Sequence, residues 1–186
     1  AKSIANQGGQ IAFTYLGDAL KKRVEPLAES INSNILIPCD VTDAKSMEKT
    51  FQILNEKWGK LDFVVHGIAF SDKNELKGKY YNTTSENFNQ TMHVSCYSFT
   101  ETCKLAEPLM KEGGSIITLT YYGAEQVMPH YNVMGVAKAA LESSVRYLAV
   151  DLGEKNIHSL SNPLRVWLFS IKEIMNTGLT TKNLLE

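Results

Sequence analysis

The sequence predicts an α/β fold in which a doubly wound parallel sheet lies between two helical layers as a three-layer sandwich. Short apolar runs alternate along the chain with amphipathic segments of helical periodicity, an order typical of parallel strands joined by right-handed crossovers. The run at 61–69, LDFVVHGIA, is apolar almost throughout, as expected for a strand buried on both faces. No internal repeat or low-complexity tract interrupts this order, which favours one domain.

The composition is that of an ordinary globular domain: 186 residues, 44% hydrophobic and 21% charged. A formal net charge of −1 argues against binding to nucleic acid or to an anionic membrane. No apolar run approaches the length of about 18 residues that a membrane helix needs. Cys39, Cys96 and Cys103 form no CxxC pair, so we expect buried thiols and a cytoplasmic protein. No two histidines have metal-ligand spacing, and we expect no metal site.

The amino-terminal part of the chain begins inside an element. Residues 1–8 read as the end of a helix that stops at Gly8-Gly9. The next elements are expected to be strands at 10–16 and 34–41 and helices at 17–31 and 43–57, the second of them capped by Thr42. A dinucleotide-binding unit opens with a strand and a glycine-rich turn, so we expect roughly 20–30 further residues upstream.

The remaining elements follow the strand at 61–69. They are a polar loop at 70–82, a long helix at 84–110, a strand at 114–121 and a helix at 131–153. The last helix is expected to pack on the sheet through Val133, Val136, Ala140, Leu141 and Leu148. After residue 157 the pattern changes abruptly. Residues 166–170 suggest a strand there, and 171–185 a weak helix.

Two tyrosines and a lysine mark the candidate site. Tyr131 and Lys138 are seven residues apart, which is about 700° of helix and places both side chains within about 20° of one face. Tyr121 ends the strand at 114–121, at the sheet edge where open parallel sheets bind ligands. An ammonium beside a phenol hydroxyl favours the phenolate and makes the hydroxyl a better acid. The pattern therefore predicts a proton donor for reduction chemistry, although such a pair is also common as simple packing.

The run YYGAEQVMPHYNVMGVAKAALE carries a specific resemblance. Its Tyr-x6-Lys spacing, with a further tyrosine ten residues upstream, resembles the bacterial enoyl-acyl carrier protein reductases, a branch of the short-chain dehydrogenase/reductases. The resemblance implies a Rossmann-like fold, incomplete at both ends here, and a homotetrameric oxidoreductase of type II fatty-acid biosynthesis. It implies NADH as cofactor and an enoyl thioester on acyl carrier protein as substrate. It covers 1–157 as a partial dinucleotide-binding domain and leaves 158–186 as a tail without a match.

The resemblance also implies the roles of individual residues. Tyr131 would donate a hydrogen bond to the thioester carbonyl oxygen as an enolate forms. Lys138 would hold the nicotinamide ribose, and Tyr121 would line the acyl pocket beside the carbonyl. Ala69 and Met134 would complete the substrate contacts with the two tyrosines. The alternative assignment makes Tyr121 the acid and Tyr131 its structural neighbour.

The implied cofactor contacts are Leu16, Asp40, Val41, Gly67 and Lys138. The Asp40 carboxylate would accept from the adenine amine, with orientation of the following helix as its alternative role. Gly67 lacks a Cβ where the backbone would approach a ribose. No arginine follows Leu16 directly, which favours NADH, whereas Lys21 and Lys22 keep NADPH open.

Two other functions remain open on the residues alone. One is another carbonyl-reducing short-chain dehydrogenase. The Tyr-x6-Lys spacing argues against it, and so does Ser95, which stands where the ordinary enzymes have an asparagine. The other is a non-catalytic remnant that packs against partner subunits through the helices at 84–110 and 131–153. The lack of a pyrophosphate-binding turn and the change of pattern after residue 157 favour the second.

Overall fold

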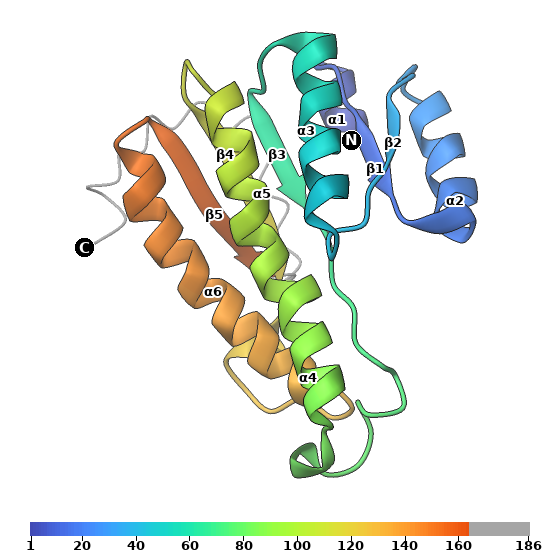
Figure 1. Ribbon diagram of the computed structural model, residues 1–186, viewed down its shortest axis with the longest axis vertical. Helices are drawn as coiled ribbons and strands as arrows, with labels where there is room; N and C mark the ends of the chain where they lie inside the picture. The colour runs from blue at the N-terminus through green and yellow to red at the C-terminus, as the bar shows by residue number, and fades with distance from the viewer. Residues whose placement is uncertain (164–186) are drawn as a thin grey trace.

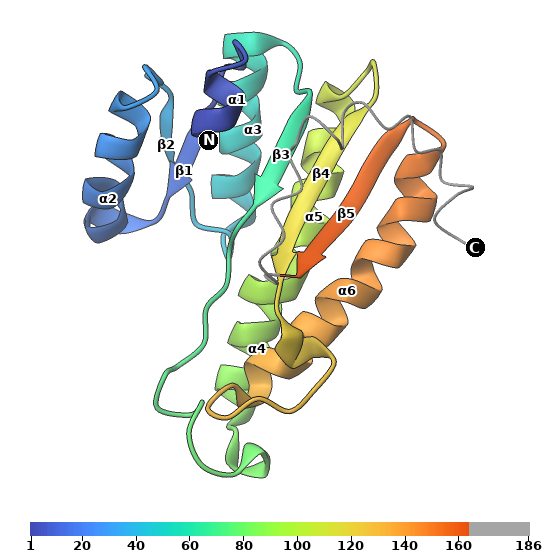
Figure 2. The ribbon, with the colours of Figure 1, turned by 180° about the vertical axis from the view of Figure 1, so that it is seen from behind.

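The computed structural model describes residues 1–163 and confirms an α/β fold with parallel strands (Figure 1). Helices α3 (Ala44–Trp58), α5 (Ser98–Ala106) and α6 (Asn132–Gly153) lie on one face of the strands. Seen from behind, the strands lie in front of these helices, and α1 (Lys2–Ala5) is on the near side (Figure 2). None of the described helices is long and apolar enough to cross a membrane.

The amino-terminal strands form a two-stranded parallel sheet. Strand β1 (Phe13–Tyr15) pairs with β2 (Leu36–Pro38), and α2 (Gly17–Glu29) connects them. Both strands are shorter than predicted, because the ladder extends only over the three residues that face each other. Helix α3 begins one residue later than predicted. Its N-cap is therefore Asp43, which accepts from the Lys45 N–H at 3.0 Å, and not Thr42.

The second sheet has the order β3-β4-β5 and contains the candidate site. Strands β3 (Phe63–His66), β4 (Gly114–Thr120) and β5 (Ile157–Pro163) are all parallel, and β5 pairs with β4 along its whole length. No strand was predicted at β5. This strand begins at residue 157, where the family resemblance was expected to end. Its pairing with β4 is non-local, so no local periodicity identifies it. The strand and helix expected within 164–186 lie outside the described residues.

The long helix predicted at 84–110 is present but changes its winding. It consists of α4 (Ser85–Met92), a π-helical turn at His93–Tyr97, α5 and a short 3₁₀ turn at Glu107–Leu109. π-Turns are rare and are frequently found at functional sites. The turn inserts an extra residue into the helix. Ser95 within it and Ser98 directly after it are both fully buried.

Helix α6 packs on the sheet largely as predicted. Val133 and Leu141 are fully buried, and the partly buried Ala140 and Leu148 pack against the main core. Val136 was predicted wrongly, since 38% of it is exposed. One step of the helix rotates it by about 100° from the fully buried Ala137 and off the inward face.

Buried His66 joins three elements of this core. Its Nε2 lies 2.8 Å from the Ser98 Oγ of α5, and its Nδ1 lies 3.1 Å from the Thr118 Oγ1 of β4. The Ser98 hydroxyl donates to the Val94 carbonyl oxygen at 2.7 Å, so His66 Nε2–H donates to Ser98. The Thr118 hydroxyl faces both Nδ1 and the His66 carbonyl oxygen, to which it donates at 3.3 Å. Burial and the Lys138 charge lower the pKa of His66 to about 4.

The buried imidazole makes the stability of the fold pH-dependent. The folded chain protonates His66 only near its lowered pKa of about 4, whereas the unfolded chain does so near 6.5. Between these values the unfolded state binds more protons, so the free energy of unfolding falls as the pH falls through this window. The loss approaches about 3 kcal/mol at pH 4. Urea unfolding between pH 7 and pH 4 measures it.

The matched variants for this titration are His66→Gln and, as a control, the exposed His130→Gln. His66→Gln should flatten the pH dependence between pH 6.5 and 4, and His130→Gln should not. An equal slope in the parent and in His66→Gln would show that other groups carry the effect.

Candidate active site

The carboxyl ends of the strands bring the predicted site residues to one edge of the molecule, where the strands run in the same direction (Figure 1). Leu16 follows β1, and Asp40 comes two residues after the end of β2. Gly67 follows β3 directly, and Tyr121 follows β4. A parallel sheet binds ligands at this edge, because loops of different strands converge there.

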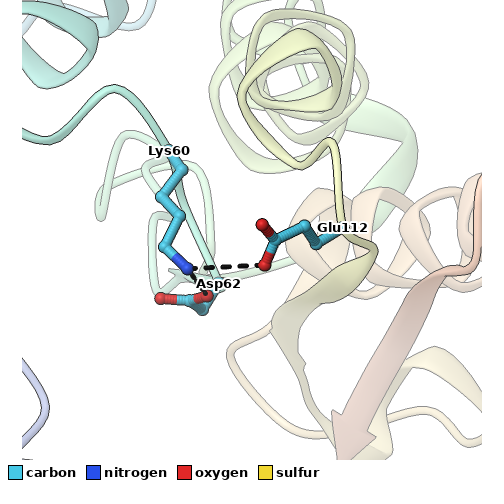
Figure 3. Close-up of polar contacts among 3 residues, drawn as sticks. All are labelled: Lys60, Asp62 and Glu112. Carbon is cyan, nitrogen blue, oxygen red and sulfur yellow. Dashed lines mark ion pairs between the residues drawn. The ribbon is translucent and has the colours of Figure 1, made fainter.

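The opposite edge carries a surface ion network (Figure 3). Lys60 Nζ lies 3.5 Å from Asp62 Oδ1 and 3.6 Å from Glu112 Oε2, at the amino ends of β3 and β4. All three side chains are more than half exposed, so these ion pairs contribute little to stability. The adjoining hollow of about 320 Å³ lies between the segments that precede these two strands. It is therefore distant from the predicted site residues.

The two tyrosines are in direct contact. The ring of Tyr121 meets that of Tyr131 edge to face, with centroids 4.9 Å apart at 60°. The loop between them packs tightly on α6: a Cβ at Gly123 would collide with the Tyr131 ring, and one at Gly135 would lie 2.7 Å from the Gly123 carbonyl oxygen. Glycine is therefore required at both positions for the helix to approach the loop.

Tyr131 is the N-cap of α6, so the helix begins one residue later than predicted, and Lys138 lies within it. Lys138 is buried, and its Nζ donates to the Leu119 carbonyl oxygen of β4 at 2.8 Å. Burial lowers the pKa of Lys138. Its contact with Leu119 uses one of its three N–H donors.

Tyr131 is a neutral phenol in this setting. Burial and the neighbouring Tyr121 raise the pKa of Tyr131 to about 12, whereas an adjacent ammonium would have lowered it. The hydroxyl therefore keeps its proton at neutral pH and can donate a hydrogen bond to an oxygen that becomes negative. Met134, almost fully buried one turn into α6, donates its backbone N–H to the Tyr131 carbonyl oxygen at 2.9 Å.

The residues expected to meet a nucleotide lie along the same edge. Asp40 Oδ1 accepts from the N–H and the hydroxyl of Thr42, at 2.8 and 2.7 Å, and these hydrogen bonds lower the pKa of Asp40. The carboxylate thus orients the turn before α3 and retains its second oxygen. Leu16 is 55% exposed, whereas Val41 is buried against Cys39 and Met47 in a small second cluster.

Gly67 and Ala69 follow β3, and both residues are exposed. A Cβ at Gly67 would meet only the Leu119 side chain, at 3.5 Å, so the fold itself does not require a glycine there. Close approach of a ligand to the backbone would instead account for a glycine at this position. Among residues 1–163, no group of three or more His, Cys, Asp or Glu side chains is placed to hold a metal ion.

Ser95 fixes the backbone that follows β3. Its Oγ accepts from the Phe70 N–H at 3.0 Å and donates to the Phe70 carbonyl oxygen at 3.1 Å. Sequence reasoning singled out Ser95 but could not predict the π-turn that directs it inward. It also missed Glu142, which accepts from Thr120 Oγ1 at 2.6 Å at the end of β4. The sequence did offer one signal for Glu142: it is a carboxylate one helical turn after Lys138.

A parallel α/β sheet with two tyrosines and a buried lysine at its carboxyl edge is the architecture of the short-chain dehydrogenase/reductases. A family model described as enoyl-(acyl carrier protein) reductase matches residues 1–159, and the chain belongs to that family. This confirms the resemblance stated from the tyrosine–lysine run.

Relatives and solved structures agree. The chain is 62% identical over 157 residues to enoyl-[acyl-carrier-protein] reductase [NADH] 2 of Rhizobium meliloti, covering 84% of this chain and 59% of the relative. It is 56% identical to the corresponding Rickettsia felis protein, with 84% and 60% covered. A solved Anaplasma phagocytophilum reductase in complex with NAD superposes with a TM-score of 0.83 at 60% identity, covering 86% of this chain and 62% of that one. The chain thus spans about 60% of its curated relatives.

The close approach of Gly135 to Gly123 predicts an unusual mutational sign. Alanine within a helix normally stabilises by up to about 1 kcal/mol relative to glycine. Gly135→Ala should instead lower the free energy of unfolding by about 1–3 kcal/mol, because the new Cβ meets a backbone carbonyl that cannot move alone. Urea midpoints measure this. Gly67→Ala is the control and should fold normally, and a stabilised Gly135→Ala would contradict the packing.

Proposed function

We propose that the whole protein is an NADH-dependent enoyl-acyl carrier protein reductase, which reduces the trans-2 double bond of enoyl thioesters in type II fatty-acid biosynthesis. The observation that carries the proposal is the Tyr131 phenol, kept neutral by burial and held against Tyr121 at the carboxyl end of β4. Relatives more than half identical over this region bear that name. The cofactor is NADH, with NADPH as the alternative.

The chain's own residues support this chemistry in distinct ways. NADH, when bound, supplies the hydride that is added to the β-carbon of the enoyl thioester. Tyr131 keeps its proton and donates a hydrogen bond to the thioester carbonyl oxygen, where negative charge develops. Tyr121 packs on Tyr131 and limits where the carbonyl can lie. Met134 and Ala69 would line the space for the acyl chain.

The residues present fit a nicotinamide dinucleotide. Lys138 retains two N–H donors for ribose hydroxyls after its contact with Leu119. Asp40 retains a carboxylate oxygen for the adenine amine, and the backbone at Gly67 can be approached closely. Lys21 and Lys22, the possible partners for the extra phosphate of NADPH, lie on α2, where Lys21 is 3.5 Å from Glu25.

We also infer the partners from surface chemistry and resemblance. The substrate is an enoyl group on acyl carrier protein, and the protein is a homotetramer that assembles through its long helices. Large apolar side chains on the outer faces of these helices support the assembly: Tyr97, Tyr147 and Val150 are each more than half exposed. The three cysteines are free and buried, which supports a cytoplasmic location.

Removal of one hydroxyl tests the role of Tyr131. In the whole protein, Tyr131→Phe should lower kcat by roughly ten- to a thousandfold, because one positioned donor is lost. The affinity for NADH should change little. Tyr121→Phe should be milder, and the exposed Tyr147→Phe is the control. Steady-state kinetics with a crotonyl thioester measures this. If Tyr131→Phe keeps the parental kcat and Tyr121→Phe is inactive, Tyr121 is the donor and Tyr131 its structural neighbour.

Lys138 should act on the cofactor instead. Lys138→Ala should weaken NADH binding at least about tenfold, because the ammonium and its buried stem are both lost. Nicotinamide fluorescence during an NADH titration measures this without turnover. Lys155→Ala, which removes an exposed lysine paired with Glu107, is the control and should bind NADH normally. If the parent itself binds no NADH, the non-catalytic remnant becomes the better description.

A further inference from the structure

The residue after Tyr131 has an unusual backbone. Asn132 begins α6 with φ +33°, in the left-handed region that residues other than glycine seldom adopt. His130, on the other side of Tyr131, is also left-handed with φ +58°. Tyr131 therefore sits between two residues in sparsely populated conformations. Such a backbone persists only where surrounding contacts hold it.

The side chain of Asn132 supplies such a contact. Its Nδ2 donates to the carbonyl oxygens of Glu75 and Gly78, at 3.2 and 3.4 Å. Both acceptors belong to the loop between β3 and α4, more than fifty residues away in the sequence. The amide therefore ties the beginning of α6 to the loop that leaves the neighbouring strand.

That loop is itself fixed at both ends. The Glu75 carboxylate accepts from the N–H and the hydroxyl of Thr84, the N-cap of α4, at 2.8 and 2.9 Å. It also accepts from Asn87 Nδ2 at 3.3 Å. Asn87 is almost fully buried, and its Oδ1 accepts from the Asp72 N–H at 3.0 Å. The loop that anchors Asn132 is thus held to α4 by several hydrogen bonds.

We propose that Asn132 is a positioning residue for Tyr131: its amide, anchored on the Glu75–Gly78 loop, holds the start of α6 so that the Tyr131 ring stays against Tyr121. Asparagine suits the position for two reasons. It tolerates a left-handed backbone better than other residues with a side chain, and its amide supplies two N–H donors. Glycine would keep the backbone without the tether, and aspartate would set a carboxylate against two carbonyl oxygens.

The catalytic meaning of this tether rests on the proposed function, but the placement of the ring does not. Small displacements of a positioned donor reduce rates strongly. If Tyr131 is the donor, Asn132 acts on the reaction only through it. A loss of the tether should therefore lower kcat and leave the KM for NADH unchanged.

The test uses Asn132→Gly, which retains the left-handed backbone and removes only the amide. The matched control is Asn32→Gly, an exposed asparagine with φ +56° far from the site. NMR of the chain with ¹³C-labelled tyrosine, assigned with Tyr131→Phe, follows the titration of Tyr131 and its contacts with Tyr121. Asn132→Gly should move the pKa of Tyr131 from about 12 toward that of a solvated tyrosine and weaken the ring–ring contacts. Asn32→Gly should change neither.

A second variant guards against a folding defect. Glu75→Gln keeps the shape of the anchor but places an amide N–H against the Thr84 donors, so it should shift Tyr131 in the same direction and less far. An unchanged Tyr131 signal in Asn132→Gly overturns the proposal. In the whole protein, Asn132→Gly should lower kcat by about ten- to a hundredfold at constant KM for NADH. A displaced Tyr131 with parental kcat would support the tether and refute Tyr131 as the donor.

Discussion

Buried polar groups at the carboxyl ends of β3 and β4 are the constraint on which the rest of the structure depends. A polar group removed from water is costly unless it finds a partner inside the protein. Here the partners come from the helices: His66 meets Ser98 of α5, and Lys138 of α6 meets the Leu119 carbonyl of β4. Each hydrogen bond fixes a helix to a strand end. The site is therefore built by the same contacts that close the core.

The same burial sets the electrostatics of the site. Loss of solvent lowers the pKa values of His66 and Lys138 and raises that of Tyr131, so each environment disfavours the charged form. A neutral tyrosine in a low-dielectric pocket is a poor acid in its resting state but a well-placed hydrogen-bond donor. Such a donor interacts most strongly with charge that develops on its partner, which is what the proposed reduction would require of it.

The sequence alone predicted the elements whose signal is local. Helical periodicity predicted α2, α3 and α6, and apolar runs predicted β1 to β4, because burial of one face or of both faces leaves a periodic pattern. The two tyrosines and the lysine of the candidate site were singled out from their spacing. The predictions for Val136 and for the N-cap of α3 were wrong, the first by a small angle on the helix and the second by one residue. Periodicity is insensitive to errors of this size.

The remaining features depend on contacts between distant segments. Strand β5 exists through its pairing with β4, and His66 has partners 32 and 52 residues away. The π-turn at Ser95 and the tether of Asn132 likewise follow from tertiary contacts rather than from propensity. The contact of Lys138 with the Leu119 carbonyl oxygen likewise joins residues 19 apart in the sequence.

The pH dependence of hydride transfer in a single turnover of the whole protein tests most directly whether Tyr131 acts as a neutral donor. With NADH and a crotonyl thioester at saturation, the rate constant should be independent of pH from 6 to 10, because the pKa of Tyr131 lies near 12. A rate that falls above an apparent pKa of 7 to 9, with that transition absent in Tyr131→Phe, would contradict the account. It would show a tyrosine activated by a nearby charge instead.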